Sequence, residues 1–139
     1  MKKLILVVLG LLALAAASFI AEGFLDAMLH GGSPERRLAK LSKEMNSGLP
    51  KQIDKETRLD LTIAGPGIRF TYLYTLVNVS SNDINAGKFT AVMKPRILNS
   101  YKTAPDLAAF RRMQVELEYQ YRDKNSNVVA RIVISPKDF

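Results

Sequence analysis

The chain begins with an apolar run that the surface of a small soluble domain could not hold. Lys2 and Lys3 precede it, residues 4–21 carry no charged side chain, and Glu22 is the first charge beyond it. As a helix the run would rise roughly 27 Å, close to the ~30 Å hydrocarbon core of a bilayer. We predict that residues 1–32 are a transmembrane anchor or signal segment with a juxtamembrane turn. Residues 33–139 would then form a single extracytoplasmic domain.

Two interpretations of the run stay open. Residues 4–14 followed by three alanines at 15–17 fit the apolar region and cleavage site of a signal peptide. Apolar residues continue to Ala21, which favours an uncleaved anchor. The basic residues precede the run, so the N-terminus is expected to stay cytoplasmic. We therefore expect a single-pass protein of the bacterial inner membrane with a periplasmic domain; the alternative is a secreted or periplasmic protein after signal cleavage.

The composition excludes several kinds of chemistry. The chain has no cysteine, so disulfides, thiolate metal sites, a cysteine nucleophile and a lipid-modified cysteine are ruled out. His30 is the single histidine and has no partner for a metal site. The net charge of +7 is accompanied by no nucleic-acid recognition motif. We predict no cofactor, no metal and no nucleic acid, and expect that the protein is not an enzyme.

Hydrophobic periodicity divides the rest of the chain into helices and hairpins. Ser33-Pro34-Glu35 is a helix start, and Gly48 and Pro50 end that helix. A period of two then predicts strands at 57–63 and 68–77 around the turn at 65–67, and again at 115–122 and 128–134. Between the hairpins we expect a helix at 83–101, kinked or broken at Pro95, and a short helix from about Thr103 to Met113. This order predicts an α+β domain with a four-stranded antiparallel sheet and helices on one face.

The predicted strands share one apolar face with four tyrosines. That face is expected to be the core, although an aromatic groove for a peptide or glycan is the alternative. Its members are Leu59, Leu61, Ile63, Phe70, Tyr72, Tyr74, Leu76, Val115, Leu117, Tyr119, Tyr121, Val128, Ile132 and Ile134. On the opposite face an apolar strip is predicted as a partner surface. The strip consists of Leu73, Val77, Val129 and Val133.

Charged residues suggest two further candidates. The first predicted helix carries basic residues near the apolar run, which form either a solvated face or contacts to anionic lipid headgroups. These are Arg36, Arg37, Lys40 and Lys43. The carboxylates of Asp54, Glu56 and Asp60 are close in sequence and are the best candidates for a hydrolase, but the pattern is more typical of a salt-bridged edge. The turn at 65–67 contains proline and is not a phosphate loop.

Three segments resemble a group of small bacterial envelope proteins with an N-terminal apolar segment. They are LPKQIDKETRLD at 49–60, AGPG at 64–67 and YLYTLVN at 72–78. The resemblance implies a strand-turn-strand with AGPG as the turn, and it implies no activity. Members of the group often carry cysteines near the positions of Tyr101 to Thr103 and at the C-terminus, where this chain has none. The resemblance therefore implies that packing, for example of Phe139 against Tyr101, replaces a disulfide.

The sequence combines an export or anchor segment with a folded domain, and it shows no set of residues typical of an active site. These features predict a binding function. We expect a membrane-tethered periplasmic binding or accessory module of an envelope protein complex, held by residues 4–21, with a membrane or periplasmic protein as partner. The alternative is a secreted domain that inhibits or neutralises an envelope enzyme or toxin.

Overall fold

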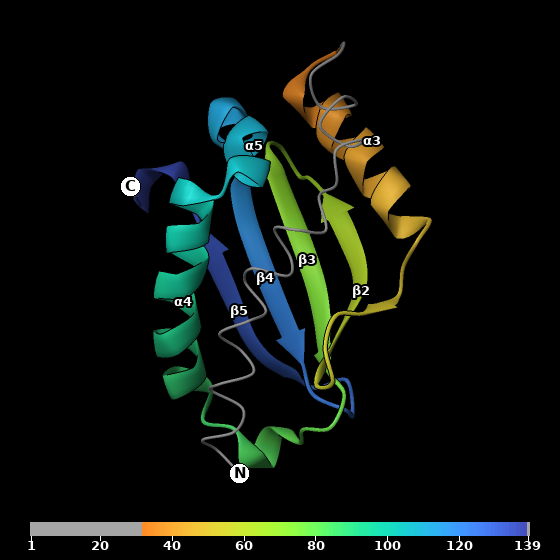
Figure 1. The fold of residues 1–139 in the computed structure, drawn as a ribbon, viewed down its shortest axis with the longest axis vertical. Coiled ribbons are helices and arrows are strands. Elements are labelled where there is room, and N and C mark those ends of the chain that lie inside the picture. Colours follow the sequence, from red (N-terminus) through yellow and green to blue (C-terminus); the bar gives the residue numbers. More distant parts are fainter. Residues whose placement is uncertain (1–31, 139) are drawn as a thin grey trace.

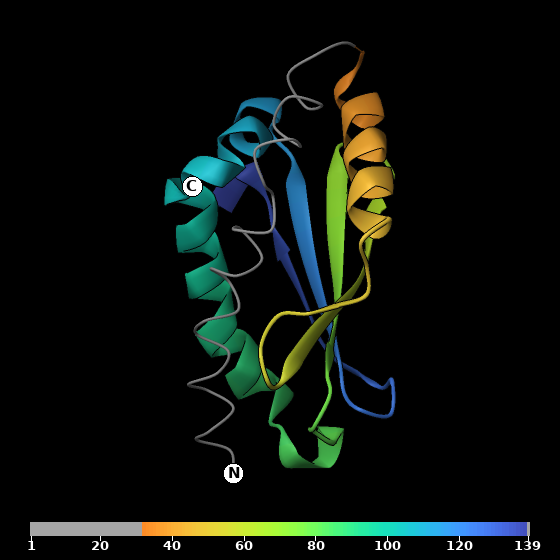
Figure 2. The same ribbon diagram turned by 45° about the vertical axis from the view of Figure 1, so that its right-hand side comes forward.

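The structure, a computed structural model, describes residues 32–138, so the apolar run, His30 and Phe139 lie outside the described residues. Within them no helix is both long enough and apolar enough to cross a bilayer. The domain has two layers: a twisted sheet, and helices that cover one of its faces (Figures 1 and 2). The strands are β1 (Lys51–Gln52), β2 (Thr57–Ala64), β3 (Arg69–Leu76), β4 (Glu116–Arg122) and β5 (Val128–Ile134). The helices are α3 (Pro34–Asn46), α4 (Ala86–Thr103) and α5 (Ala108–Met113), with short 3-10 turns at 81–83, 105–107 and 136–138.

The α+β class and the helices on one face are confirmed, but the predicted four-stranded antiparallel sheet is wrong. The sheet has five strands in the order β1-β2-β3-β4-β5, and the central pair, β3 and β4, is parallel. The segment between the hairpins carries α4 and α5 across the sheet and returns the chain in the direction of β3, as a parallel crossover requires. β1 was missed because two residues are too short to show a period.

The helix boundaries follow local capping. The side chain of Ser33 accepts a hydrogen bond from the backbone N–H of Arg36, as its predicted role as N-cap requires. α4 begins after Asn85, whose side chain accepts from Lys88 N–H, and it runs unbroken through Pro95. Pro95 has no backbone N–H, so the helical hydrogen bond to the carbonyl of Ala91 is missing. Both residues are exposed, so water can bond that carbonyl instead.

A β-bulge at Asp60 changes which side chains of β2 face the helices. Leu59 lies opposite Tyr74, and Leu61 lies opposite Leu73, so Asp60 is the extra residue. After the bulge Leu61 and Ile63 point to the open face, where they are 41% and 44% exposed. The prediction that they belong to the core is wrong, because strict alternation was assumed across this residue.

A second bulge near Val129 has the same effect on β5. Ala130 pairs with Tyr121 and Val128 pairs with Arg122, which leaves Val129 as the extra residue. Val128 is therefore 53% exposed on the open face, whereas Val129 is 7% exposed. Both positions differ from the prediction, which placed Val128 inside and Val129 outside.

Thr62 takes the inward position that the bulge creates in β2. Its hydroxyl lies 2.9 Å from Ser42 Oγ and donates to Asn46 Oδ1 over 2.9 Å. Asn46 Oδ1 also accepts the Thr62 backbone N–H over 2.8 Å, and Asn46 Nδ2 donates to the Thr62 carbonyl over 3.0 Å. The side-chain amide of α3 thus bonds both backbone groups of Thr62 at the edge of β2, where β1 no longer pairs with it.

The core lies between the helices and the sheet, and the tyrosine face is part of it. The rings of Tyr72, Tyr74, Tyr119 and Tyr121 are at most 2% exposed, and their centroids follow one another at 5.1 to 6.2 Å across β3 and β4. Burial raises the pKa of each of these phenols above its usual value, because the ionised form would be deprived of water. The core interpretation is therefore confirmed for these four side chains.

Tyr101 ties the end of α4 to the start of β4. Its hydroxyl donates to the Val115 carbonyl over 2.6 Å and lies 3.2 Å from the Phe110 carbonyl. Burial raises its pKa to about 12, against the opposing effects of Arg111 and the bond to Val115. The packing of Phe139 against Tyr101 involves a residue outside the described part and stays a prediction.

Asp123 joins the turn between β4 and β5 to the segment that leaves β3. Its carboxylate accepts backbone N–H groups of Asn125, Asn127 and Ser81 over 2.8 to 2.9 Å. Burial acts to raise the pKa of Asp123, but the hydrogen bonds from Asn127, Ser81 and Asn125 prevail and lower it to about 2. The ionised carboxylate therefore stabilises the folded state.

We expect Asp123→Asn to remove part of the acid sensitivity of the fold. A carboxyl whose pKa is lower in the folded chain stabilises it above the unfolded pKa of about 4, and this contribution disappears as the pH falls towards 2. Urea midpoints measured between pH 6 and pH 2 should therefore differ between the natural chain and the variant near neutrality and converge in acid. A difference for Asp123→Asn that stays constant over this pH range would contradict the expectation.

Candidate functional site

The open face of the sheet, which no described helix covers, is the candidate functional site (Figure 2). Four strands contribute alternate side chains to it because their other side chains enter the core. Its rows follow the strand register. They are Arg58, Thr75, Arg122 and Val128; then Leu61, Leu73, Gln120 and Arg131; then Ile63, Thr71, Glu118 and Val133; and finally Arg69 and Glu116.

This face gathers the exposed large apolar side chains of residues 32–138. Leu61, Ile63 and Val128 are the three of that kind, and all of them lie on it. Both bulges contribute, because each turns an apolar residue from the core side to the open side. Leu61 pairs with Leu73, and Ile63 lies on the next row, so three apolar side chains form one patch over β2 and β3. We call Leu61, Ile63 and Leu73 the bulge patch.

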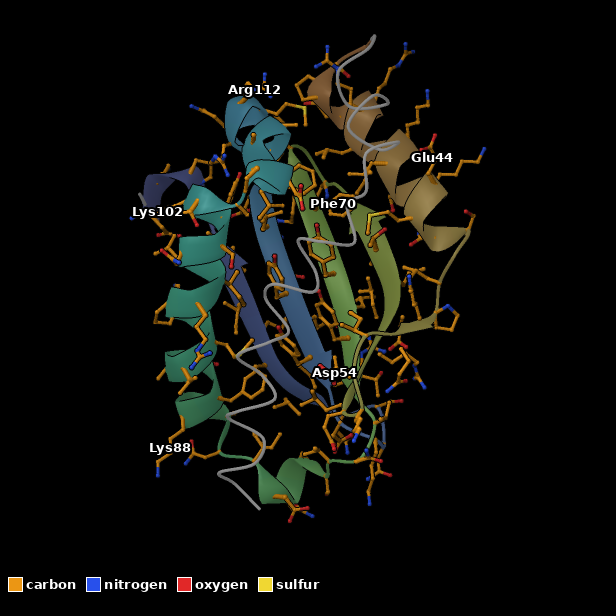
Figure 3. All side chains as sticks on the ribbon, in the orientation of Figure 1. Glu44, Asp54, Phe70, Lys88, Lys102 and Arg112 are labelled. Carbon is orange, nitrogen blue, oxygen red and sulfur yellow. The ribbon has the colours of Figure 1, made fainter. Side chains whose placement is uncertain are left out.

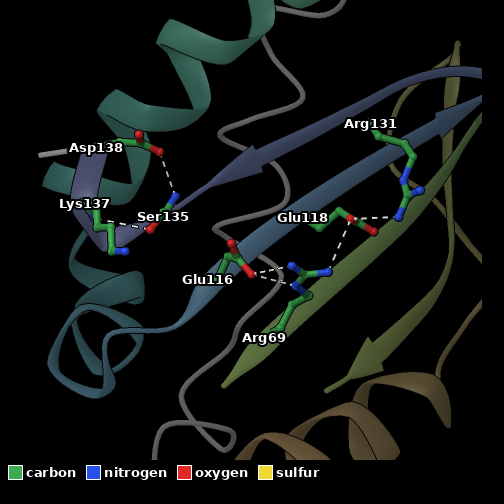
Figure 4. A network of polar contacts seen from close by, with 7 residues as sticks. All are labelled: Arg69, Glu116, Glu118, Arg131, Ser135, Lys137 and Asp138. Atoms are coloured by element: carbon green, nitrogen blue, oxygen red, sulfur yellow. Dashed lines mark hydrogen bonds and ion pairs between the residues drawn. The ribbon is translucent and has the colours of Figure 1, made fainter. Parts of the chain in front are cut away.

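A charged network lies beside the bulge patch, over β3, β4 and β5 (Figure 4). Arg69 contacts Glu116 at 2.6 Å and Glu118 at 4.0 Å, and Arg131 contacts Glu118 at 3.0 Å. The Glu118 side chain is only 6% exposed, whereas the Arg131 side chain is 58% exposed. Two guanidinium groups thus neutralise one nearly buried carboxylate, and the outer arginine keeps donors that face solvent.

Between the patch and the network lies an open hollow of about 350 Å³. Thr71 and Gln120 form part of its floor, the turn at Gly65 and Pro66 borders it, and Ile63 and Leu73 bring apolar surface. Its charged lining consists of Arg69, Arg122, Arg131 and Glu118. The Nε atom of Arg122 is buried and has no hydrogen-bond partner among the described residues. Sites for small molecules usually enclose most of their ligand, whereas this hollow is open. Its neighbouring apolar and cationic walls are better suited to a segment of a partner protein.

The predicted apolar strip is only partly assembled on this face. Leu73 and Val133 lie on it, but on different rows and separated by β4. Val129 is buried at its bulge, and Val77 follows the end of β3. The strip of four is therefore not a contiguous surface, and the alternation that suggested it hid the contribution of Leu61 and Ile63.

The three candidate carboxylates have separate structural partners. Asp54 accepts the backbone N–H groups of Glu56 and Thr57. Glu56 accepts from Asn78, and Asp60 pairs with Arg58 and Thr75. Among residues 32–138 no group of three His, Asp or Glu side chains is placed to hold a metal ion.

The four cations predicted to contact lipid lie on α3, on the layer opposite the open face. Arg36, Lys40 and Lys43 are exposed, and Arg37 is half-buried. They take no part in the hollow, so the structure separates a polar and apolar sheet face from a basic helical face.

Comparison with known proteins finds similarity in fold. No family model and no curated protein matches the chain. A protein of Pseudomonas aeruginosa described as secreted superposes with a TM-score of 0.61 at 16% identity, over 77% of this chain and 97% of that one. The type II secretion system pilotin AspS of Vibrio cholerae gives 0.56 at 10% identity, over 76% and 92%. The type 2 secretion system pilotin EpsS of Vibrio vulnificus gives 0.57 at 7% identity, over 75% and 89%.

Proposed function

We propose that this chain is a non-catalytic accessory module of a bacterial envelope complex, and that it binds a partner protein through the open face of its sheet. The bulge patch carries the proposal. Leu61 and Ile63 are 41% and 44% exposed, so covering what remains exposed would contribute roughly 1 kcal/mol each to binding, and apolar side chains of this size are usually in the core. β-bulges commonly serve to redirect a side chain. Two bulges that both turn apolar residues outward therefore support a binding role for this face.

The fold similarity supports the envelope setting. Two of the similar structures are pilotins of type 2 secretion systems, and a third is described as a secreted protein. The apolar run at residues 4–21 is consistent with the same compartment. We propose that the domain works there beside a membrane, held by the run if it is retained.

The alternative is a secreted domain that inhibits or neutralises an envelope enzyme or toxin, and the similarity to a secreted protein favours it. Intact mass of the protein isolated from its own cells separates the two. Loss of about 17 residues, as signal cleavage requires, would support the secreted form. An intact N-terminus would support the tethered form.

We expect Ile63→Asp to abolish partner binding with little effect on the fold. A carboxylate at the centre of the bulge patch would have to be desolvated in the complex, which weakens binding by at least tenfold. A photo-crosslinking residue in place of Leu61, in the full chain in its own cells, should give a discrete product that Ile63→Asp removes. Both substitutions alter exposed side chains, so the urea midpoint should change little.

The matched control places the same charge outside both faces, at exposed Asn82 of the 3-10 turn 81–83. Asn82→Asp should leave the crosslinked product unchanged. If both aspartate variants remove the product, or neither does, the open face is not the binding surface.

A further inference from the structure

We infer that the helical layer of this domain binds the headgroups of anionic phospholipids. The charge of the chain is divided unequally between the two layers. The helices α3 and α4 and the segment 105–113 contain ten lysines and arginines and three acidic residues. The remaining described residues contain eight of each sign. In residues 1–31 two lysines and two acids cancel, so the whole net charge of +7 lies on the helical layer.

The cations of α3 form a stripe on its solvent side. Arg36, Lys40 and Lys43 are spaced by four and three residues, which places them on one helical face. The opposite face carries Leu38 and Leu41, which are fully buried against the sheet.

The longer helix α4 also carries cations and contains no acidic residue, although its cations are spread around its solvent-exposed side. Its four cations are Lys88, Lys94, Arg96 and Lys102, and all are exposed. Figure 3 shows Lys88 and Lys102 projecting outward from α4. Both α3 and α4 cover the same face of the sheet, so both belong to one layer of the domain (Figure 1). Exposed Arg112 of α5 adds a further charge near the start of α3 (Figure 3).

A lipid surface fits this layer better than a protein partner does. The cations are spread over two helices rather than gathered at one point, so the layer offers a broad field of positive charge. Such a field suits the diffuse negative charge of a bilayer leaflet. In the tethered form proposed above, the apolar run ends at Ala21, about a dozen residues before α3 begins at Pro34, and would hold the helical layer close to a bilayer. Binding by the helices leaves the open sheet face for a protein, and it does not depend on that protein.

The absence of cysteine from the chain makes a direct test practicable. The full chain with the single change Ala91→Cys carries a spin label on the solvent side of α4, and Ile63→Cys carries one on the open sheet face. Each protein is reconstituted in vesicles of phosphatidylcholine, with or without about one-third phosphatidylglycerol. We expect the label at Ala91 to be protected from a water-soluble nickel chelate in anionic vesicles alone. Protection should decrease at 0.5 M salt, where the Debye screening length is only about 4 Å. The label at Ile63 should stay accessible under all of these conditions.

Charge variants identify the residues responsible. Each Lys or Arg near an anionic leaflet increases the equilibrium constant for membrane binding about fivefold. Lys88→Gln with Lys102→Gln should therefore reduce the ratio of docked to free domain by about 25-fold. The control Lys55→Gln with Lys124→Gln removes two exposed charges from the loops of the sheet layer and should leave protection unchanged. Equal protection at Ala91 in neutral vesicles, equal losses in both double variants, or protection at Ile63 instead would overturn the inference.

Discussion

Phe70→Ala is expected to lower the free energy of unfolding by about 3–5 kcal/mol, whereas Ile63→Ala should lower it by less than about 1 kcal/mol. The two residues lie on adjacent rows of the same hairpin. Phe70 is fully buried, with ring centroids 5.2 Å from Tyr72 and 5.4 Å from Phe110. Its removal leaves a cavity at the centre of the core, where α5 meets β3. Ile63 is 44% exposed because the bulge at Asp60 turns it away from the core.

Urea unfolding followed by circular dichroism measures both values, with the slope compared to confirm two-state behaviour. The experiment is also a test of the bulge. A straight β2 would bury Ile63, and its truncation would then cost about 2–4 kcal/mol. Similar losses for the two variants would therefore contradict the bulge, and Phe70→Leu should recover most of the loss at that position.

Asn46→Ala should destabilise the domain by about 2–3 kcal/mol, which is more than a helical surface change normally costs. The amide of Asn46 bonds the backbone N–H, the carbonyl and the hydroxyl of Thr62. Thr62 is 2% exposed, so these groups cannot all find water once the amide is lost. The variant also uncovers a part of the β2 edge, so we expect it to aggregate at a lower concentration than the natural chain.

Unfolding midpoints and light scattering at increasing concentration measure the two effects. The control Asn99→Ala makes the same change at an exposed position of α4 and should alter neither. Thr62→Val, which keeps the backbone groups of residue 62 but removes its hydroxyl, should show a smaller loss than Asn46→Ala. A loss of equal size would assign the effect to the hydroxyl alone and contradict the role of the amide at the edge.

Periodicity predicted most of the elements because it reports burial directly. The amphipathic pattern of Leu38, Leu41 and Met45 predicted α3, and the alternation around residues 65–67 predicted the first hairpin. Strand order could not be obtained in this way. The direction in which β4 joins β3 depends on where α4 and α5 pack, and no local pattern in either strand records it.

The candidate surface was harder to predict for the same reason. The prediction that Leu73 and Val133 lie on the open face is confirmed, because the alternation of side chains is regular at both positions. Leu61 and Ile63 were assigned to the core because apolar side chains at alternate positions normally point inward. They point to the open face because the bulge at Asp60 turns Thr62 inward in their place. Thr62 is hydrogen-bonded there to Ser42 and Asn46, which are 20 and 16 residues away in sequence.

The parallel pairing of β3 with β4 has a consequence for the order in which the chain is made. β2 can cover one edge of β3 as soon as the first hairpin exists, but the other edge belongs to a strand that starts about 40 residues later. Until those residues have followed, whether from the ribosome or across a membrane, that edge of β3 has no partner in its own chain. During that interval Arg69 to Leu76 can pair with the same strand of a neighbouring chain. Chains truncated between Leu76 and Glu116 should therefore self-associate more readily than chains that include β4.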